Sequence, residues 1–122
     1  MLQCGFVRAG TLVWCYGSTH VGVMVGESVT LTVSEHVYVY CNYIDCWHNS
    51  DMILRNCELT PENDADRFNF SCDSGRHTCE LTILNAQIED SGEYFCADDW
   101  HMFESNFRVT LIRKLFRHFH QL

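Results

Sequence analysis

Short runs in which apolar and polar residues alternate fill the chain from Gly26 onward. In the run 28–33 every second residue is Val or Leu and the others are Ser or Thr, so an extended chain would bury one face and expose the other. Turn residues cluster between such runs, at 49–51 and 61–64. Several short strands separated by turns predict an all-β sandwich or barrel. The remaining predicted strands are 37–41, 52–54, 67–71, 78–84, the residues around Tyr94 and Cys96, and 107–112.

Size and charge limit the classes of function. A chain of 122 residues fits one domain, and its 47% of hydrophobic residues is enough for a packed core. The formal net charge of −8 at pH 7 repels phosphate backbones, so we expect no nucleic-acid partner.

Cysteine is abundant for this length. Disulfides are the simplest use of so many thiols, and they place the chain in an oxidising compartment, extracellular or at the cell surface. Structural zinc is the competing interpretation, but no close Cys-x-x-Cys pair occurs. Eight cysteines allow 105 pairings, so the connectivity stays open. The cysteines are Cys4, Cys15, Cys41, Cys46, Cys57, Cys72, Cys79 and Cys96.

The two ends of the chain differ from its centre. Residues 1–20 form either a weak secretory-signal-like segment or, in the other interpretation, an irregular extension or a first strand. No apolar run reaches the roughly 18 residues that span a bilayer. Residues 113–122 are basic and amphipathic, because Leu115, Phe119 and Leu122 continue a helical spacing that begins at Leu111. An alternative function is therefore a peripheral membrane-associated module that uses this tail. The other interpretation is an extension beyond the last strand.

The stretch 81–96, LTILNAQIEDSGEYFC, identifies the strands further. It resembles the E strand, the E–F turn and the F strand of immunoglobulin V-set domains, and GESVTL at 26–31 resembles the start of the B strand in the same family. The resemblance covers 21–112 and implies an immunoglobulin-like V-type β-sandwich of two antiparallel sheets.

The resemblance also implies roles for single residues. Gly92 permits the tight corner, Tyr94 is the tyrosine-corner residue whose hydroxyl bonds to the backbone, and Cys96 points into the core. Arg67, which follows Asp66 at the start of the D strand, would pair with Asp90 of the E–F turn.

The cysteine pattern departs from the family. Val33 occupies the place of the B-strand cysteine that normally pairs with Cys96. Cys41 shares the inward face of the predicted strand 37–41, so we expect a disulfide between Cys41 and Cys96 across the two sheets. A second interpretation makes Tyr40 the replacement for the core tryptophan of strand C and Cys41 an extra C-strand cysteine.

The end of the resemblance is also informative. Residues 103–106 do not form the Phe-Gly-x-Gly joining motif of antibody and T-cell-receptor variable domains. The chain is more similar to innate leukocyte receptor V domains of the polymeric-immunoglobulin-receptor-like group. This similarity implies a recognition module of an innate immune-type receptor or soluble relative, which binds a protein or lipid ligand at the cell surface through its loops.

The F–G region is the expected ligand-binding loop, because it combines aromatic and acidic side chains at one end of the sandwich. In the alternative, Trp100 and Phe103 fold back onto the sandwich edge. An enzyme would have to recruit Glu104 and His101 with the neighbouring acids, but no activated nucleophile or phosphate-binding loop accompanies them, so we expect no enzyme, no cofactor and no metal. The expected ligand-binding residues are Asp98, Asp99, Trp100, His101, Met102 and Phe103.

One modification signal remains. Asn69, Phe70 and Ser71 form an Asn-x-Ser acceptor for N-glycosylation, which is used only on a secreted chain and at an accessible position.

Overall fold

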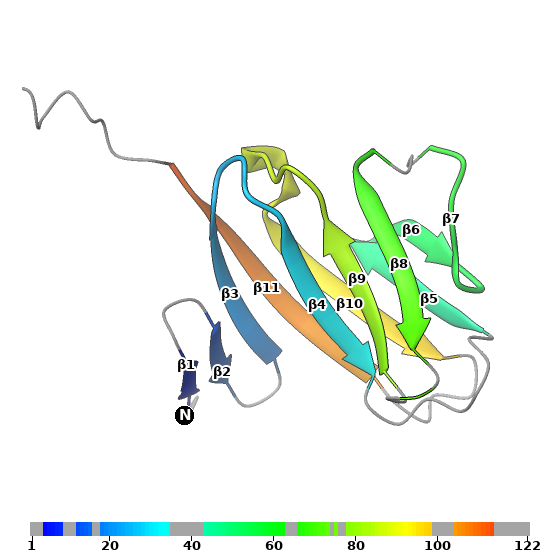
Figure 1. Cartoon of the computed structure of the whole chain (residues 1–122), viewed down its shortest axis with the longest axis horizontal. Helices are drawn as coiled ribbons and strands as arrows, with labels where there is room; N and C mark the ends of the chain where they lie inside the picture. The colour runs from blue at the N-terminus through cyan, green and yellow to red at the C-terminus, as the bar shows by residue number, and fades with distance from the viewer. Residues whose placement is uncertain are drawn as a thin grey trace, which may run out of the picture.

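The computed structural model describes residues 4–8, 12–15, 18–34, 43–62, 66–73, 75, 78–98 and 104–113. These residues form two β-sheets packed face to face, with one short 3-10 helix between two strands (Figure 1). The V-type sandwich predicted from the sequence is therefore confirmed.

The larger sheet has eight strands in the order β1-β2-β3-β11-β10-β5-β6-β7. All neighbours in it are antiparallel except β3 and β11, which are parallel, so the expectation of purely antiparallel sheets fails at this pair. The strands are β1 (Cys4–Arg8), β2 (Leu12–Cys15), β3 (Ser18–Met24), β5 (Ile44–His48), β6 (Asp51–Arg55), β7 (Glu58–Leu59), β10 (Gly92–Asp98) and β11 (Glu104–Ile112).

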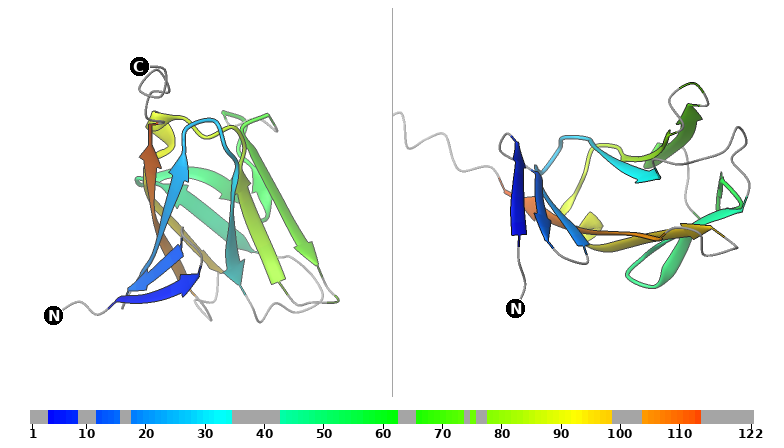
Figure 2. Two further views of the ribbon diagram at one scale, coloured as in Figure 1. Left: turned by 60° about the vertical axis from the view of Figure 1, so that its left-hand side comes forward. Right: turned by 90° about the horizontal axis from the view of Figure 1, so that it is seen from below.

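The smaller sheet has three antiparallel strands in the order β4-β9-β8. They are β4 (Val29–Ser34), β9 (Thr78–Ile83) and β8 (Phe68–Asp73). The 3-10 helix η1 (Ile88–Asp90) follows β9 and leads into β10, so it carries the chain from the smaller sheet to the larger one. Figure 2 shows the two sheets as separate layers.

The core lies between the layers. The alternation seen in the sequence holds along β4, where Leu31 and Val33 are buried while Thr30 and Thr32 are exposed. Tyr94 and Val109 enter the same core from the larger sheet. Both sheets therefore present one apolar face inward, as a sandwich requires.

Five strands of the larger sheet lie outside the predicted strand ranges, namely β1, β2, β3, β5 and β7. β5 and its turn fall in the region where the alternation is interrupted by Trp47 and by the polar residues 48–51. β3 begins before the expected boundary at Val21, and the hairpin β1–β2 continues the sheet beyond it. These strands form because they pair with neighbouring strands, and the local sequence does not reveal that pairing.

Candidate functional site

The disulfide of Cys96 differs from the prediction. Cys96 is bonded to Cys46 and not to Cys41, which lies outside the described residues. Cys46 and Cys96 are directly opposite each other on the adjacent strands β5 and β10, with 4.1 Å between their Cα atoms. The error has a physical source, since the strand that faces Cys96 is β5 and not the predicted strand 37–41.

The second disulfide that the structure describes joins Cys72 on β8 to Cys79 on β9, again between directly opposite positions. Each bridge thus lies within one sheet. Between the sheets, Val33 is fully buried where the family normally has the second half of its bridge. Among the described disulfides, none crosses the core.

The E–F corner has the predicted contacts. Arg67 forms an ion pair with Asp90, whose carboxylate also accepts a hydrogen bond from the backbone N–H of Gln87 at 2.7 Å. The Tyr94 hydroxyl donates to the backbone carbonyl of Asp90. The hydrogen bond to Asp90 raises the pKa of the Arg67 guanidinium, and burial raises the pKa of the Tyr94 phenol. These residues fix the turn that starts β10.

The far end of β10 forms one end of the sandwich. Asp98, the last residue of β10, pairs with Ile44, the first residue of β5. The backbone N–H of Cys57 donates to the Ile44 carbonyl at 2.9 Å, and the backbone N–H of Asn56 donates to Asp45 Oδ1 at 2.9 Å. We call this group, Ile44, Asp45, Asn56, Cys57 and Asp98, the loop end.

The structure places only part of the expected ligand-binding set. Asp98 is half-buried at the loop end, whereas Asp99, Trp100, His101, Met102 and Phe103 lie outside the described residues. Glu104, named in the enzymatic alternative, is exposed at the start of β11. The segment 99–103 connects β10 to β11, so it begins at the loop end.

An aromatic pair on the larger sheet was missed by the sequence analysis. Trp47 on β5 and Phe95 on β10 are directly opposite, with ring centroids 5.8 Å apart. Their strand neighbours Cys46 and Cys96 point into the core, so these rings project from the outer face, where both are half-buried. An ion pair between Arg108 and Glu93 (3.6 Å) lies on the same face. Assigning β5 as a strand is the step that would have revealed the pair.

We call the outward residues Trp47, Phe95, Glu93 and Arg108 the aromatic face.

The outer face of the smaller sheet is polar. Thr30 and Thr82 form a hydrogen bond across β4 and β9 at 2.9 Å. Asn69 and Ser71, the first and last residues of the glycosylation signal, are both exposed on β8. The acceptor side chain is therefore accessible.

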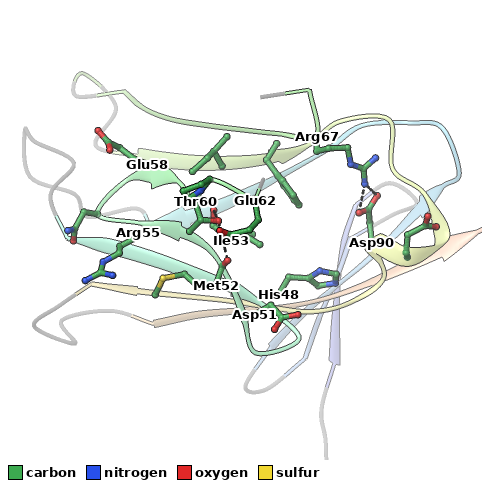
Figure 3. A pocket seen from close by; sticks show the side chains of 15 residues that line it. His48, Asp51, Met52, Ile53, Arg55, Glu58, Thr60, Glu62, Arg67 and Asp90 are labelled. Atoms are coloured by element: carbon green, nitrogen blue, oxygen red, sulfur yellow. Dashed lines mark hydrogen bonds and ion pairs between the residues drawn. The ribbon is translucent and has the colours of Figure 1, made fainter. Parts of the chain in front are cut away.

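A groove of about 1140 Å³ opens between the sheets, beside β6, β7 and η1 (Figure 3). The Arg67–Asp90 pair closes one end of it, and Ile53 and Phe68 lie among its lining residues. Its charged lining is mixed in sign and includes the acidic Glu58 and Glu62 and the basic Arg55.

Within the described ranges, no group of three or more His, Cys, Asp or Glu side chains could hold a metal ion. No helix in the same ranges is long and apolar enough to cross a membrane. The basic tail from Lys114 onward lies outside these ranges, so its membrane contact stays a prediction.

Comparison with known proteins agrees with this fold. The structure is similar to Tim-2, with a TM-score of 0.64 and 16% identity over 82% of this chain and 96% of that chain. It is also similar to the I9–I11 tandem of titin, with a TM-score of 0.57 and 17% identity over 93% of this chain. The chain spans 34% of the titin tandem. At such identities, these likenesses show the fold alone.

No curated protein matches the chain. The sequence profile of the immunoglobulin V-set domain matches residues 16–112, which is most of the chain. Together with the two sheets and the E–F corner described above, this match shows that the chain belongs to the immunoglobulin V-set family.

Proposed function

We propose that the protein is an extracellular recognition module of an innate immune-type receptor or a soluble relative, and not an enzyme. It binds a protein ligand through the aromatic face together with the segment 98–103 that begins beside it. The observation that carries the proposal is the Trp47–Phe95 pair, which is partly exposed on the outer face of the larger sheet. Aromatic side chains at partly exposed positions are the commonest anchors of protein interfaces.

The difference between the two outer faces supports this assignment. The smaller sheet presents threonines and the accessible Asn69, whereas the larger sheet presents two aromatic rings beside an ion pair. A glycan on Asn69 would cover the polar face and leave the aromatic face free. Loss of the glycan mass in secreted Asn69→Gln and Ser71→Ala proteins tests this part, and an unchanged mass in either variant contradicts it.

The compartment follows from the disulfides. Cys46–Cys96 and Cys72–Cys79 form and persist where thiols are oxidised, which favours secretion or display at the cell surface.

A binding screen against leukocyte surface proteins and lipid vesicles would identify the ligand, and single substitutions would then locate the surface. Trp47→Ala and Trp100→Ala should each raise the dissociation rate tenfold or more, because a buried aromatic anchor contributes about 2 kcal/mol. Asp98→Asn with Asp99→Asn should chiefly slow association at low salt. Thr82→Ala on the polar face is the matched control and should leave both rates unchanged.

The ligand screen also separates the alternatives. Binding that survives Trp47→Ala and Trp100→Ala but is lost in Thr82→Ala would move the surface to the smaller sheet. Binding to vesicles alone, removed by deleting 113–122, would favour the membrane-associated module.

A further inference from the structure

The hairpin β1–β2 repeats the cysteine geometry of the two described disulfides. Cys4 and Cys15 are partners in its register, as Cys46 and Cys96 are in β5–β10 and Cys72 and Cys79 are in β8–β9. Directly opposite residues of antiparallel strands have Cβ atoms about 4.5–5.5 Å apart, close to the spacing of about 3.5–4.5 Å in disulfides. The backbone thus places this third pair at the separation that a disulfide needs.

The turn between β6 and β7 supplies a separate constraint. Cys57 in this turn is disulfide-bonded. Its backbone N–H donates to the carbonyl of Ile44 at 2.9 Å, so the turn lies against the first residue of β5. Cys41 precedes Ile44 by three residues, a span of about 10 Å at most. Cys41 is therefore within reach of Cys57.

We propose that the two remaining disulfides are Cys4–Cys15 and Cys41–Cys57. A swapped pairing, in which Cys4 or Cys15 bonds to Cys41 or Cys57, is excluded by the distance between the two pairs. The strands β2 and β5 are four steps apart in the larger sheet. At about 4.8 Å a step the two strands are about 19 Å apart. When the reach of about 10 Å from Ile44 to Cys41 is subtracted, about 9 Å remains, which is beyond the limit of about 6.8 Å between the Cα atoms of a disulfide.

Each bond forms by thiol–disulfide exchange. One thiolate of the pair attacks a disulfide oxidant, such as oxidised glutathione, and forms a mixed disulfide with the release of one thiol. The second thiolate then attacks the protein sulfur of that mixed disulfide and releases the other thiol. Two protein thiols are oxidised, and the oxidant carries away both electrons and both protons.

The proposed Cys41–Cys57 bridge acts on the recognition surface, an inference that rests on the proposed function. It would join the segment 35–42, between β4 and β5, to the β6–β7 turn at the loop end. Asp98, the last residue of β10, lies at the same end. The bridge would thus tie residue 41 to the β6–β7 turn beside Asp98, which lowers the ordering cost of binding.

Peptide mapping of the oxidised protein tests the connectivity without any ligand. After unreacted thiols are blocked, digestion with trypsin, a glutamyl protease and a protease that cleaves before Asp places each cysteine on a fragment of its own. The expected linked products are 1–8 with 9–27, 36–44 with 56–58, 45–50 with 94–97, and 68–72 with 77–80. A link from 56–58 to 1–8 or 9–27, or a blocked thiol on 36–44, overturns the proposal. Fully reduced protein is the control.

Substitution gives a second, independent readout. Cys41→Ser should expose one new thiol, on fragment 56–58, whereas Cys4→Ser should expose one only on 9–27. A thiol on the other fragment in either variant overturns the pairing. Once a ligand is known, Cys41→Ser with Cys57→Ser should weaken its binding several-fold. If peptide mapping of the parent confirms the pairs but the double variant binds the ligand as tightly as the parent, the proposed recognition surface is wrong and the connectivity stands.

Discussion

Tyr94 is fully buried, and its hydroxyl donates to the Asp90 carbonyl. Burial raises the pKa of this phenol above its usual value of about 10. The folded state therefore holds the proton where the unfolded chain loses it. The contribution of the hydroxyl to the free energy of unfolding is complete below about pH 10 and falls as the pH rises further.

Tyr94→Phe should lower the free energy of unfolding by about 0.5–1.5 kcal/mol at pH 7, because one hydrogen bond is lost and the ring is kept. The difference from the parent should narrow above about pH 10, where only the parent loses the contribution of this hydroxyl. Urea melts from pH 7 to 11 measure both effects. A difference that stays constant or widens with pH would contradict the assignment.

Arg67 and Arg108 provide a matched comparison of ion pairs. The side chain of Asp90 is 7% exposed beside Arg67, whereas that of Glu93 is 55% exposed beside Arg108. Arg67→Ala leaves a buried carboxylate without its cation and should cost about 1–3 kcal/mol. Water around the one-third exposed Arg67 keeps this below the cost for a fully buried pair.

Arg108→Ala should change the free energy of unfolding by about 0–1 kcal/mol, because its pair is solvated. Urea melts of both variants at one ionic strength make the comparison. Equal losses would show that Asp90 is stabilised mainly by its hydrogen bond from Gln87 and not by Arg67.

Residue roles were predictable where a local motif sets them. Asp90 and Tyr94 follow from the stretch 81–96, Arg67 follows from the start of the D strand, and their contacts are those expected. The partner of Cys96 was not predictable, because it depends on which strand lies beside β10. That neighbour is chosen by packing over the whole sheet and not by the residues around the cysteine.

The turn between β5 and β6 is held against the start of β10 by two hydrogen bonds. The Asn49 backbone N–H donates to the Glu93 carbonyl at 2.9 Å, and the Asn49 side-chain oxygen accepts from the Glu93 N–H at 2.9 Å. Gly92 makes this approach possible, because a Cβ atom there would overlap the Asn49 side chain. Its φ of +124° also lies outside the region that other residues adopt readily.

Gly92→Ala should therefore destabilise the fold by about 1–3 kcal/mol through backbone strain, with a further loss from the displaced turn. Gly22→Ala on β3 is the control, since its Cβ would meet only Ile112 Cδ1 at an ordinary 3.4 Å. Thermal melts compare the two variants. A control that loses as much stability as Gly92→Ala would show that the strain at Gly92 has no special role.

The strands that could be predicted are those whose residues alternate regularly between apolar and polar. β4, β9 and β11 carry regular patterns with one face in the core, and each was expected near its observed position. β5 was missed because its outward positions hold Asp45 and Trp47, so the pattern does not alternate by polarity. The aromatic pair was missed with it, since Trp47 meets Phe95 only through strand pairing.

At the scale of the whole molecule, the family could be predicted and the recognition surface only in part. The sandwich follows from strand pattern and corner motif, which the fold and the family match confirm. Which outer face is aromatic depends on the neighbours of β5 and on the inward direction of Cys46. Asp98 was expected in the F–G region, and it is the last residue of β10, while its role in ligand binding stays a prediction.

The bridge between Cys46 and Cys96 has a mechanical consequence. It closes a loop of sequence separation 50, so a chain pulled by its two ends cannot lengthen through that loop. At about 3.3–3.6 Å per residue, the fully stretched molecule should be at least about 160 Å shorter when oxidised than when reduced. Single-molecule force spectroscopy with and without a reductant measures this hidden length. Equal contour lengths of the oxidised and the reduced protein would show that the bridge does not limit the extension of the chain.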